Sequence, residues 1–340
     1  MSDIPSQPIP YYSGAPAIPF AGLRMGSRTL GVIAMVLGGL SGCTAAALPL
    51  TWIMPRPASD PHLRVGHMIG SALEMLAFTV ALIYFGVGAW RLRRWTRPLA
   101  ITGGTIWLLG GTMSLIAIVF RLPHMRSVMH RGRASAPISP GADWAVLGFI
   151  IALFVAFGIV VPAAFVWFYK KPLARHMLEY YDPQPRWTDG CPLPVLGLTV
   201  SLAILGVLHV LTAPAAIDTI FGIMLFGLPA AALMLLEGTV SSLLAWLVFL
   251  RRPAGWWGSV ALTIIWTVSW AAMIFRPHHT AEMYYRAGYS DEEIAAVNGA
   301  GNVAVQLTAG ATVLFAFGYL FYFRRYFSAA AIPLSTPPVE

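Results

Sequence analysis

Eight long apolar runs constrain the fold of this chain more than any other feature. A helix needs about 20 residues to cross the hydrocarbon core of a membrane, and each run reaches that length. They occupy residues 30–53, 66–90, 99–120, 144–169, 194–213, 223–250, 256–275 and 302–323. Backbone polar groups in lipid can be satisfied only within their own segment, so each run should be a helix. The sequence predicts an all-α integral membrane protein with eight transmembrane helices.

The composition of the chain excludes a soluble globular protein. Of 340 residues, 57% are hydrophobic and 11% are charged, whereas about 25% are charged in a typical soluble domain. No phosphate-binding loop, dinucleotide fingerprint or nucleophile elbow is present, so a soluble-type catalytic domain is excluded, and whether the protein is an enzyme stays open. The formal charge of +8 comes from basic residues at the ends of the apolar runs. That placement favours a lipid bilayer as the partner and not nucleic acid.

An internal repeat runs through the chain. Phe120-Arg121 matches Phe275-Arg276 at a separation of 155 residues, and Pro123-His124 matches Pro277-His278 at 154. Arg93-Arg94 matches Arg251-Arg252 at 158. A self-match at a nearly constant separation indicates a duplicated unit. We expect two tandem four-helix units in parallel orientation.

The predicted organisation follows from this repeat. A disordered cytoplasmic tail (1–29) precedes the first membrane unit (30–171), a cytoplasmic linker (172–193), the second unit (194–327) and a cytoplasmic tail (328–340). The sixth run is ambiguous, because Pro214, Asp218 and Pro229 interrupt it. A short interfacial piece at 215–222 that leads into a proline-kinked span is the favoured interpretation, and a re-entrant hairpin is the alternative.

Lysine and arginine set the predicted orientation. The side that bears the N-terminus holds 14 of them and the opposite side holds eight. Since cytoplasmic loops carry the excess of positive residues, both termini are placed in the cytoplasm of a cell with the protein in its inner membrane. Leu40-Ser-Gly-Cys43 has the form of a lipoprotein cleavage box, but the apolar run continues past Cys43, which favours an ordinary residue within a helix.

With this orientation, seven of the eight histidines lie in outer loops or at the outer ends of helices. Imidazole with nearby methionine suits copper, and imidazole alone suits haem iron or zinc. The candidate metal ligands are His124, His278 and His279, and the candidate pair for haem b is His67 with His209. The alternative is that these histidines are interfacial side chains, and that the repeat copied a structural Pro-His turn.

Two carboxylates lie deep within the spans, Glu74 and Glu237. A charge at mid-bilayer costs at least about 2.5 kcal/mol, so such residues are expected to face the protein interior and are candidate catalytic groups. Glu74 follows His67 by two helical turns, with Gly70 between them. We predict that His67, Glu74 and His209 converge in one outward-facing pocket, where they could pass a proton. The alternative is a protonated glutamate bonded to a neighbouring hydroxyl.

Three functions remain open from the sequence. The first is a non-catalytic, quinol-linked or metal-linked subunit of a bacterial membrane complex, with other membrane subunits as partners. The second is a carrier for a small solute or ion, and the third is a structural or assembly protein. In architecture alone, two four-helix units resemble the quinol-linked membrane subunits of the polysulfide-reductase type. No motif of that family is present, so the resemblance assigns no residues.

Overall fold

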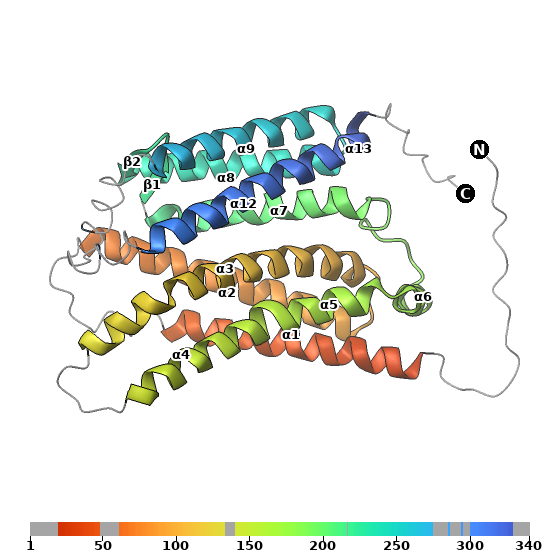
Figure 1. Ribbon diagram of the computed structural model, residues 1–340. Helices are drawn as coiled ribbons and strands as arrows, with labels where there is room; N and C mark the ends of the chain where they lie inside the picture. Colours follow the sequence, from red (N-terminus) through yellow and green to blue (C-terminus); the bar gives the residue numbers. More distant parts are fainter. Residues whose placement is uncertain are drawn as a thin grey trace, which may run out of the picture.

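A computed structural model describes residues 20–47, 61–132, 140–215, 217–274, 285, 294 and 300–328. Long helices lie roughly along one axis in two groups (Figure 1). Six of the described helical segments are long and apolar enough to cross a membrane: Ala21–Ala47, Met68–Trp90, Thr96–Val119, Trp144–Lys170, Leu193–Ala215 and Leu228–Phe249. The chain thus has the helical, multi-pass architecture that its apolar runs predict.

The first group comprises α1 (Ala21–Ala47), α2 (Pro61–Trp90), α3 (Thr96–Gly132), α4 (Pro140–Val155), the π-helical turn η2 (Ala156–Val160) and α5 (Val161–Lys170), and the short helix α6 (Pro172–Tyr181) follows it. The second group comprises α7 (Leu193–Thr212), η3 (Ala213–Ala215), β1 (Ile217–Ile220), β2 (Ile223–Phe226), α8 (Leu228–Phe249), α9 (Pro253–Ile274), α12 (Ala300–Phe323) and α13 (Arg325–Ser328). The helices α9 and α12 are not among the six spans, so the count of eight stays a prediction.

The first helix begins earlier than the sequence indicates. It starts at Ala21 and not at residue 30, and Ser27 is fully buried within it. The Ser27 hydroxyl lies 3.1 Å from the carbonyl oxygen of Ala89, to which it donates, and 3.0 Å from the hydroxyl of Tyr169. These contacts hold the polar start of α1 between α2 and α5. The helix also continues through Cys43, as the preferred interpretation of that cysteine requires.

The third helix is longer than predicted. The Phe-Arg-Leu-Pro-His segment that begins at Phe120 was expected to be a turn at the end of the span, but α3 continues through Pro123 to Gly132. The matching turn at 275–279 lies outside the described residues. The expected equivalence of His124 and His278 therefore stays a prediction.

A π-helical turn joins α4 to α5. Pro162 has no N–H, and its ring crowds the carbonyl four residues earlier, which belongs to Gly158. Widening one helical turn relieves this crowding without ending the helix. The α3 backbone packs closely against the widened turn at Gly111. Only glycine fits there, because any side chain would collide with the Gly158 carbonyl.

The sixth apolar run contains a β-hairpin and then a helix. The strands β1 and β2 pair antiparallel, and Phe221 and Gly222 between them both have positive φ, as a two-residue hairpin turn requires. The predicted span 223–250 is therefore wrong at its start, because α8 begins at Leu228. Pro229 lies in the first turn of α8, where a missing N–H costs nothing, so it starts the helix and does not kink it. The hairpin also corrects the all-α prediction.

The turns from α2 to α3 and from α8 to α9 share one geometry. Leu92 and Arg251 have φ values of 56° and 54°. In each turn the next residue donates its N–H to the carbonyl five residues earlier at 2.9 Å, which is the Schellman ending of a helix. The two positions are 159 residues apart, close to the 158 of the Arg-Arg match. A repeat over whole four-helix units stays a prediction.

Buried apolar side chains form two clusters, one in each group of helices. Tyr169, Met177 and Leu178 are central to the first, and Val195 and Val248 to the second. Contacts of α3 with α7 and α12, and of α2 with α7, join the groups. The start of α1, the helix α6 and the helix α13 lie at one end of the bundle, and the β-hairpin lies at the other (Figure 1).

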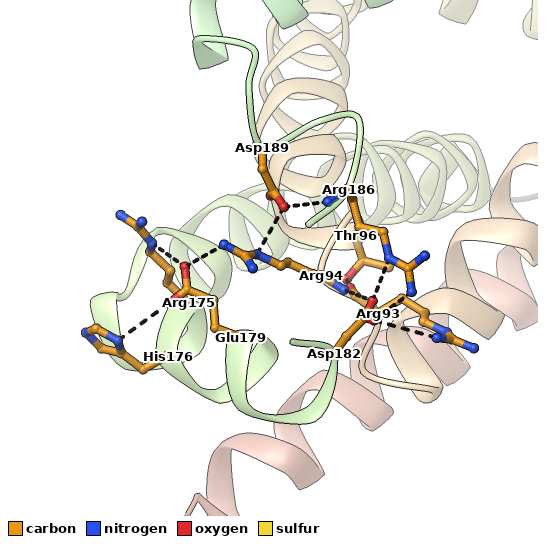
Figure 2. A network of polar contacts seen from close by, with 9 residues as sticks. All are labelled: Arg93, Arg94, Thr96, Arg175, His176, Glu179, Asp182, Arg186 and Asp189. Atoms are coloured by element: carbon orange, nitrogen blue, oxygen red, sulfur yellow. Dashed lines mark hydrogen bonds and ion pairs between the residues drawn. The ribbon is translucent and has the colours of Figure 1, made fainter. Parts of the chain in front are cut away.

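A network of charges holds the segment between the two groups against the α2–α3 turn (Figure 2). The carboxylate of Asp182 accepts from Arg186 at 2.6 Å and from the backbone N–H of Arg94 at 3.1 Å. The Arg94 side chain reaches Glu179 at 3.3 Å and Asp189 at 3.1 Å. Burial opposes ionisation of Asp182, but the bonds from Arg186 and Arg94 and the arginine charges outweigh it, so its pKa lies below the usual value. The predicted linker 172–193 is therefore firmly attached.

Candidate functional site

The structure brings together two of the predicted site residues, His209 on α7 and Glu237 on α8. The histidine Nε2 lies 3.0 Å from a carboxylate oxygen of Glu237, and the two side chains are 22% and 13% exposed. The sequence assigned these residues to separate roles, as a haem ligand and as a catalytic acid. Their 28-residue separation spans the hairpin, so no local spacing indicated the contact.

Small residues allow the two helices to approach at this point. A side chain at Gly206 would come within 2.9 Å of the Gly238 carbonyl, and one at Gly238 would come equally close to the Gly206 carbonyl. Close approach of backbones at glycine is a common means of helix association in membranes. His209 follows Gly206 by three residues and Glu237 precedes Gly238, so the crossing sets the distance between the two side chains.

The contacts of the His209 ring limit how many protons the pair can hold. The ring Nδ1 lies 2.7 Å from the carbonyl oxygen of Leu205. A carbonyl can only accept, so Nδ1 carries a hydrogen. The 3.0 Å contact between Nε2 and Glu237 then needs one proton, which resides either on the carboxyl group or on the ring. In both arrangements the pair is neutral as a whole, which suits its shielded position.

Trp266 of α9 and Asp218 of β1 complete the surroundings of the pair. The rings of Trp266 and His209 are stacked, with centroids 5.6 Å apart and planes 5° apart. One oxygen of Asp218 accepts the N–H of Thr219 at 2.7 Å, and the other is buried and makes no hydrogen bond to the described residues. Burial is the largest cause of the raised pKa of Asp218, and the bond from the Thr219 N–H opposes it only in part.

Sequence reasoning did not assign a role to either residue. Asp218 was noted only as an interruption of an apolar run, although an acid in such a run was the available signal. Trp266 gave no signal, because tryptophan is common in membrane helices.

A large cavity lies beside this group of residues. Its volume is about 930 Å³, and its walls come from α3, α7, α9 and α12, so both halves of the chain contribute. Along α7 the lining runs from Leu193 to Leu205, and on α9 it includes Trp266 and Trp270. The Trp266 ring thus has one face on His209 and also lines the cavity.

Most of the hydroxyl groups in the cavity wall already donate a hydrogen bond within the protein. Thr105, Ser201 and Thr263 donate to the carbonyl four residues earlier in their own helices, at 2.6, 2.9 and 2.8 Å. The Tyr319 hydroxyl donates to the Pro194 carbonyl at 3.1 Å. A hydroxyl bonded in this way presents its carbon atoms and a lone pair to the cavity. The wall therefore suits an apolar molecule better than a strongly hydrated one.

The remaining predicted residues are placed only in part. Glu74 is half-buried on α2, while the side chains of His67 and His124 lie outside the described part, as do His278 and His279 entirely. Convergence of Glu74 and His67 with His209 stays a prediction.

Metal binding is likewise untested. Among the described residues, no group of three His, Cys, Asp or Glu side chains could hold a metal ion. Because the side chains predicted to bind copper or haem are mostly outside that part, those cofactors stay predictions.

The chain was compared with protein-family models, with curated proteins and with solved structures, and none of the three comparisons finds a match.

Proposed function

We propose that this protein is a quinol-linked subunit of a bacterial inner-membrane complex. The cavity between the two halves would hold the quinol, and the pair formed by His209 and Glu237 would take the proton of its hydroxyl group. The observation that carries this proposal is the position of a one-proton pair beside a large apolar cavity, with Trp266 in contact with His209 and in the cavity wall.

The chemistry of a quinol matches both parts of this arrangement. Its apolar tail suits walls in which most hydroxyl donors are already used, and a volume of about 930 Å³ falls within the usual range for small-molecule sites. Oxidation of a quinol to a quinone releases two protons and two electrons. In each of two steps the pair would first release the proton that it holds to the outer side of the membrane and would then take one proton from a quinol hydroxyl, and a redox centre in a partner subunit would take the electrons.

Packing between α2 and α7 supports Glu74 as a second carboxylate for this site. A side chain at Gly70 of α2 would meet the Cα atom of Thr212 on α7 at 3.4 Å. Glu74 lies one helical turn further along the same face of α2, so we expect its side chain to face α7. Gly66 faces Pro214 and Gly70 faces Thr212, so in this antiparallel pair we expect Glu74 at about the level of Leu208, next to His209 in the chain.

Of the two other functions, a carrier for a hydrated solute fits the cavity poorly. A polar solute that enters the bilayer must exchange its water for hydrogen-bonding groups of the protein. Most of the threonine and serine hydroxyls in the wall are not free to bind such a solute, because they donate to carbonyls of their own helices. A purely structural role predicts no ligand at all, which a binding measurement can distinguish.

The first prediction concerns quinol binding and its dependence on pH. Binding of a short-tailed quinol to the purified protein should quench tryptophan fluorescence, because Trp266 and Trp270 line the cavity. If binding is linked to one proton, the affinity should change by up to about tenfold per pH unit near the titration of the pair. Glu237→Gln keeps the size of the side chain and removes the carboxyl group that shares the proton with His209, so the pH dependence should weaken while the fold is retained.

Thr239→Val is the matched control, since Thr239 lies on α8 but bonds only to the carbonyl of Leu235. This variant should bind the quinol with the pH dependence of the unaltered protein. Absence of quinol binding in the unaltered protein would end the proposal, and so would an unchanged pH dependence in Glu237→Gln.

A further inference from the structure

We propose that a second cavity, between α1 and the end of α2, binds the phosphate of an anionic phospholipid. This cavity has a volume of about 560 Å³ and lies at the end of the bundle that holds α6. Its lining consists of Ala21, Arg24, Met25, Arg28, Thr29, Val32 and Trp90. None of these residues belongs to the proposed quinol site.

Two arginines in this cavity lack a counter-charge. Arg24 and Arg28 are one helical turn apart on α1 and therefore share a face. Neither forms an ion pair with any carboxylate of the described residues, whereas Arg94 and Arg186 each reach acidic side chains. Two adjacent positive charges in a concave site favour an anion between them.

The Arg28 side chain shows where such an anion would bind. Its Nε is buried and has no hydrogen-bond partner among the described residues. Its guanidinium carbon lies 5.3 Å from the centroid of the Trp90 ring, which holds the group in place by a cation–π contact. A phosphate oxygen would supply the missing acceptor, and guanidinium groups bind phosphate with two parallel hydrogen bonds.

The apolar residues around the arginines distinguish a lipid from a free phosphate ion. Met25, Val32 and Trp90 line the same cavity and are 72%, 40% and 45% exposed. A free phosphate ion makes no favourable contact with these apolar side chains, whereas the acyl chains of a phospholipid would cover them. The predicted orientation puts this end toward the cytoplasmic leaflet, where anionic lipids gather and where basic pockets between transmembrane helices bind their headgroups.

The second prediction tests this site with defined lipids. Purified protein in a neutral detergent should bind phosphatidylglycerol more tightly than phosphatidylcholine with the same acyl chains, as measured by native mass spectrometry. Arg28→Gln and Arg24→Gln should each weaken binding of phosphatidylglycerol about fivefold. Arg252→Gln is the control, because Arg252 is an exposed arginine at the same end that does not line the cavity.

Three results would overturn the inference. Equal losses in all three variants would assign the effect to general surface charge. Equal binding of the two lipids by the unaltered protein would remove the need for a headgroup site. Protection by inorganic phosphate alone, equal to that by phosphatidylglycerol in a thermal-unfolding measurement, would identify a site for the free ion. If Arg28→Gln does not fold, Arg24→Gln decides the same comparison.

Discussion

The carboxylate of Asp182 shows how single residues attach the segment between the two halves of the chain to the first half. Its side chain is 5% exposed and carries its charge among Arg93, Arg186 and the backbone of Arg94. An acid that is buried with such partners stabilises the fold only while it is ionised. The attachment of the segment 172–193 should therefore depend on pH.

The third prediction follows from the lowered pKa of Asp182. The pKa of Asp182 is below its ordinary value of 3.8, so its contribution to stability is complete above pH 3.8 and is lost as the pH falls through the lower, folded-state pKa. Asp182→Asn should reduce the free energy of unfolding at pH 7 by about 2 kcal/mol. As the pH falls below 3.8 and through the folded-state pKa of Asp182, the difference between the variant and the unaltered protein should shrink toward zero. Denaturant unfolding in detergent over a series of pH values measures this, and a difference that does not vary with pH would contradict it.

At this scale the sequence could identify individual residues but not their partners. An acid or a histidine in an apolar run is conspicuous, and Glu237 and His209 were found in that way. Their contact depends on the crossing of α7 and α8 at Gly206 and Gly238, which no spacing along one helix encodes. Trp266 comes from a third helix, so its stacking on His209 could not be read from the sequence.

Among the elements, the existence of helices was predictable and their ends were not. Apolar length alone indicates a helix, because lipid leaves the backbone no other way to satisfy its polar groups. Apolar length does not separate a helix from a short strand pair followed by a helix, so the hairpin at β1 and β2 was missed. Pro123 was predicted to lie in a turn, but it lies within α3. Pro229 was predicted to kink a span, but it lies in the first turn of α8. Proline can be held within a membrane helix or can begin one, so its presence alone does not decide between these effects.

The fourth prediction concerns the crossing of α7 and α8. Gly206→Ala would place a carbon atom 2.9 Å from the carbonyl of Gly238, so the two helices must separate. We expect a loss of about 1–3 kcal/mol in the free energy of unfolding and a weaker contact between His209 and Glu237.

Gly39→Ala is the matched control for this change. Gly39 is also a helical glycine, but nothing lies within 4 Å of the carbon atom that the substitution adds. That variant should be unchanged or more stable by up to about 1 kcal/mol. Equal stability of the two variants would mean that α7 and α8 do not need this close approach.

For the whole molecule, the fifth prediction places the two ends of the bundle on opposite sides of the membrane. Ile223 in the hairpin and Trp187 in the segment after α6 are 54% and 58% exposed at opposite ends. In a chain whose Cys43 and Cys191 are replaced by alanine, Ile223→Cys should react with an impermeant thiol reagent in intact cells. Trp187→Cys should react only after the inner membrane is opened.

The reverse labelling pattern would mean that the protein has the opposite orientation in the membrane, with the pair of His209 and Glu237 near the cytoplasm. Reaction of both cysteines in intact cells would contradict a chain that separates these two ends by the bilayer. The orientation rests on the 14-to-eight distribution of basic residues, so labelling is the direct check of that count.

The position of the large cavity at the contact between the two halves has a practical consequence for anyone who handles the protein. An apolar space of about 930 Å³ that is bounded by α3 and α7 should take up the apolar chain of a detergent during purification. Such a molecule raises the melting temperature in proportion to the logarithm of its concentration once its site is nearly full. Preparations of the same protein in different detergents should then have different melting temperatures.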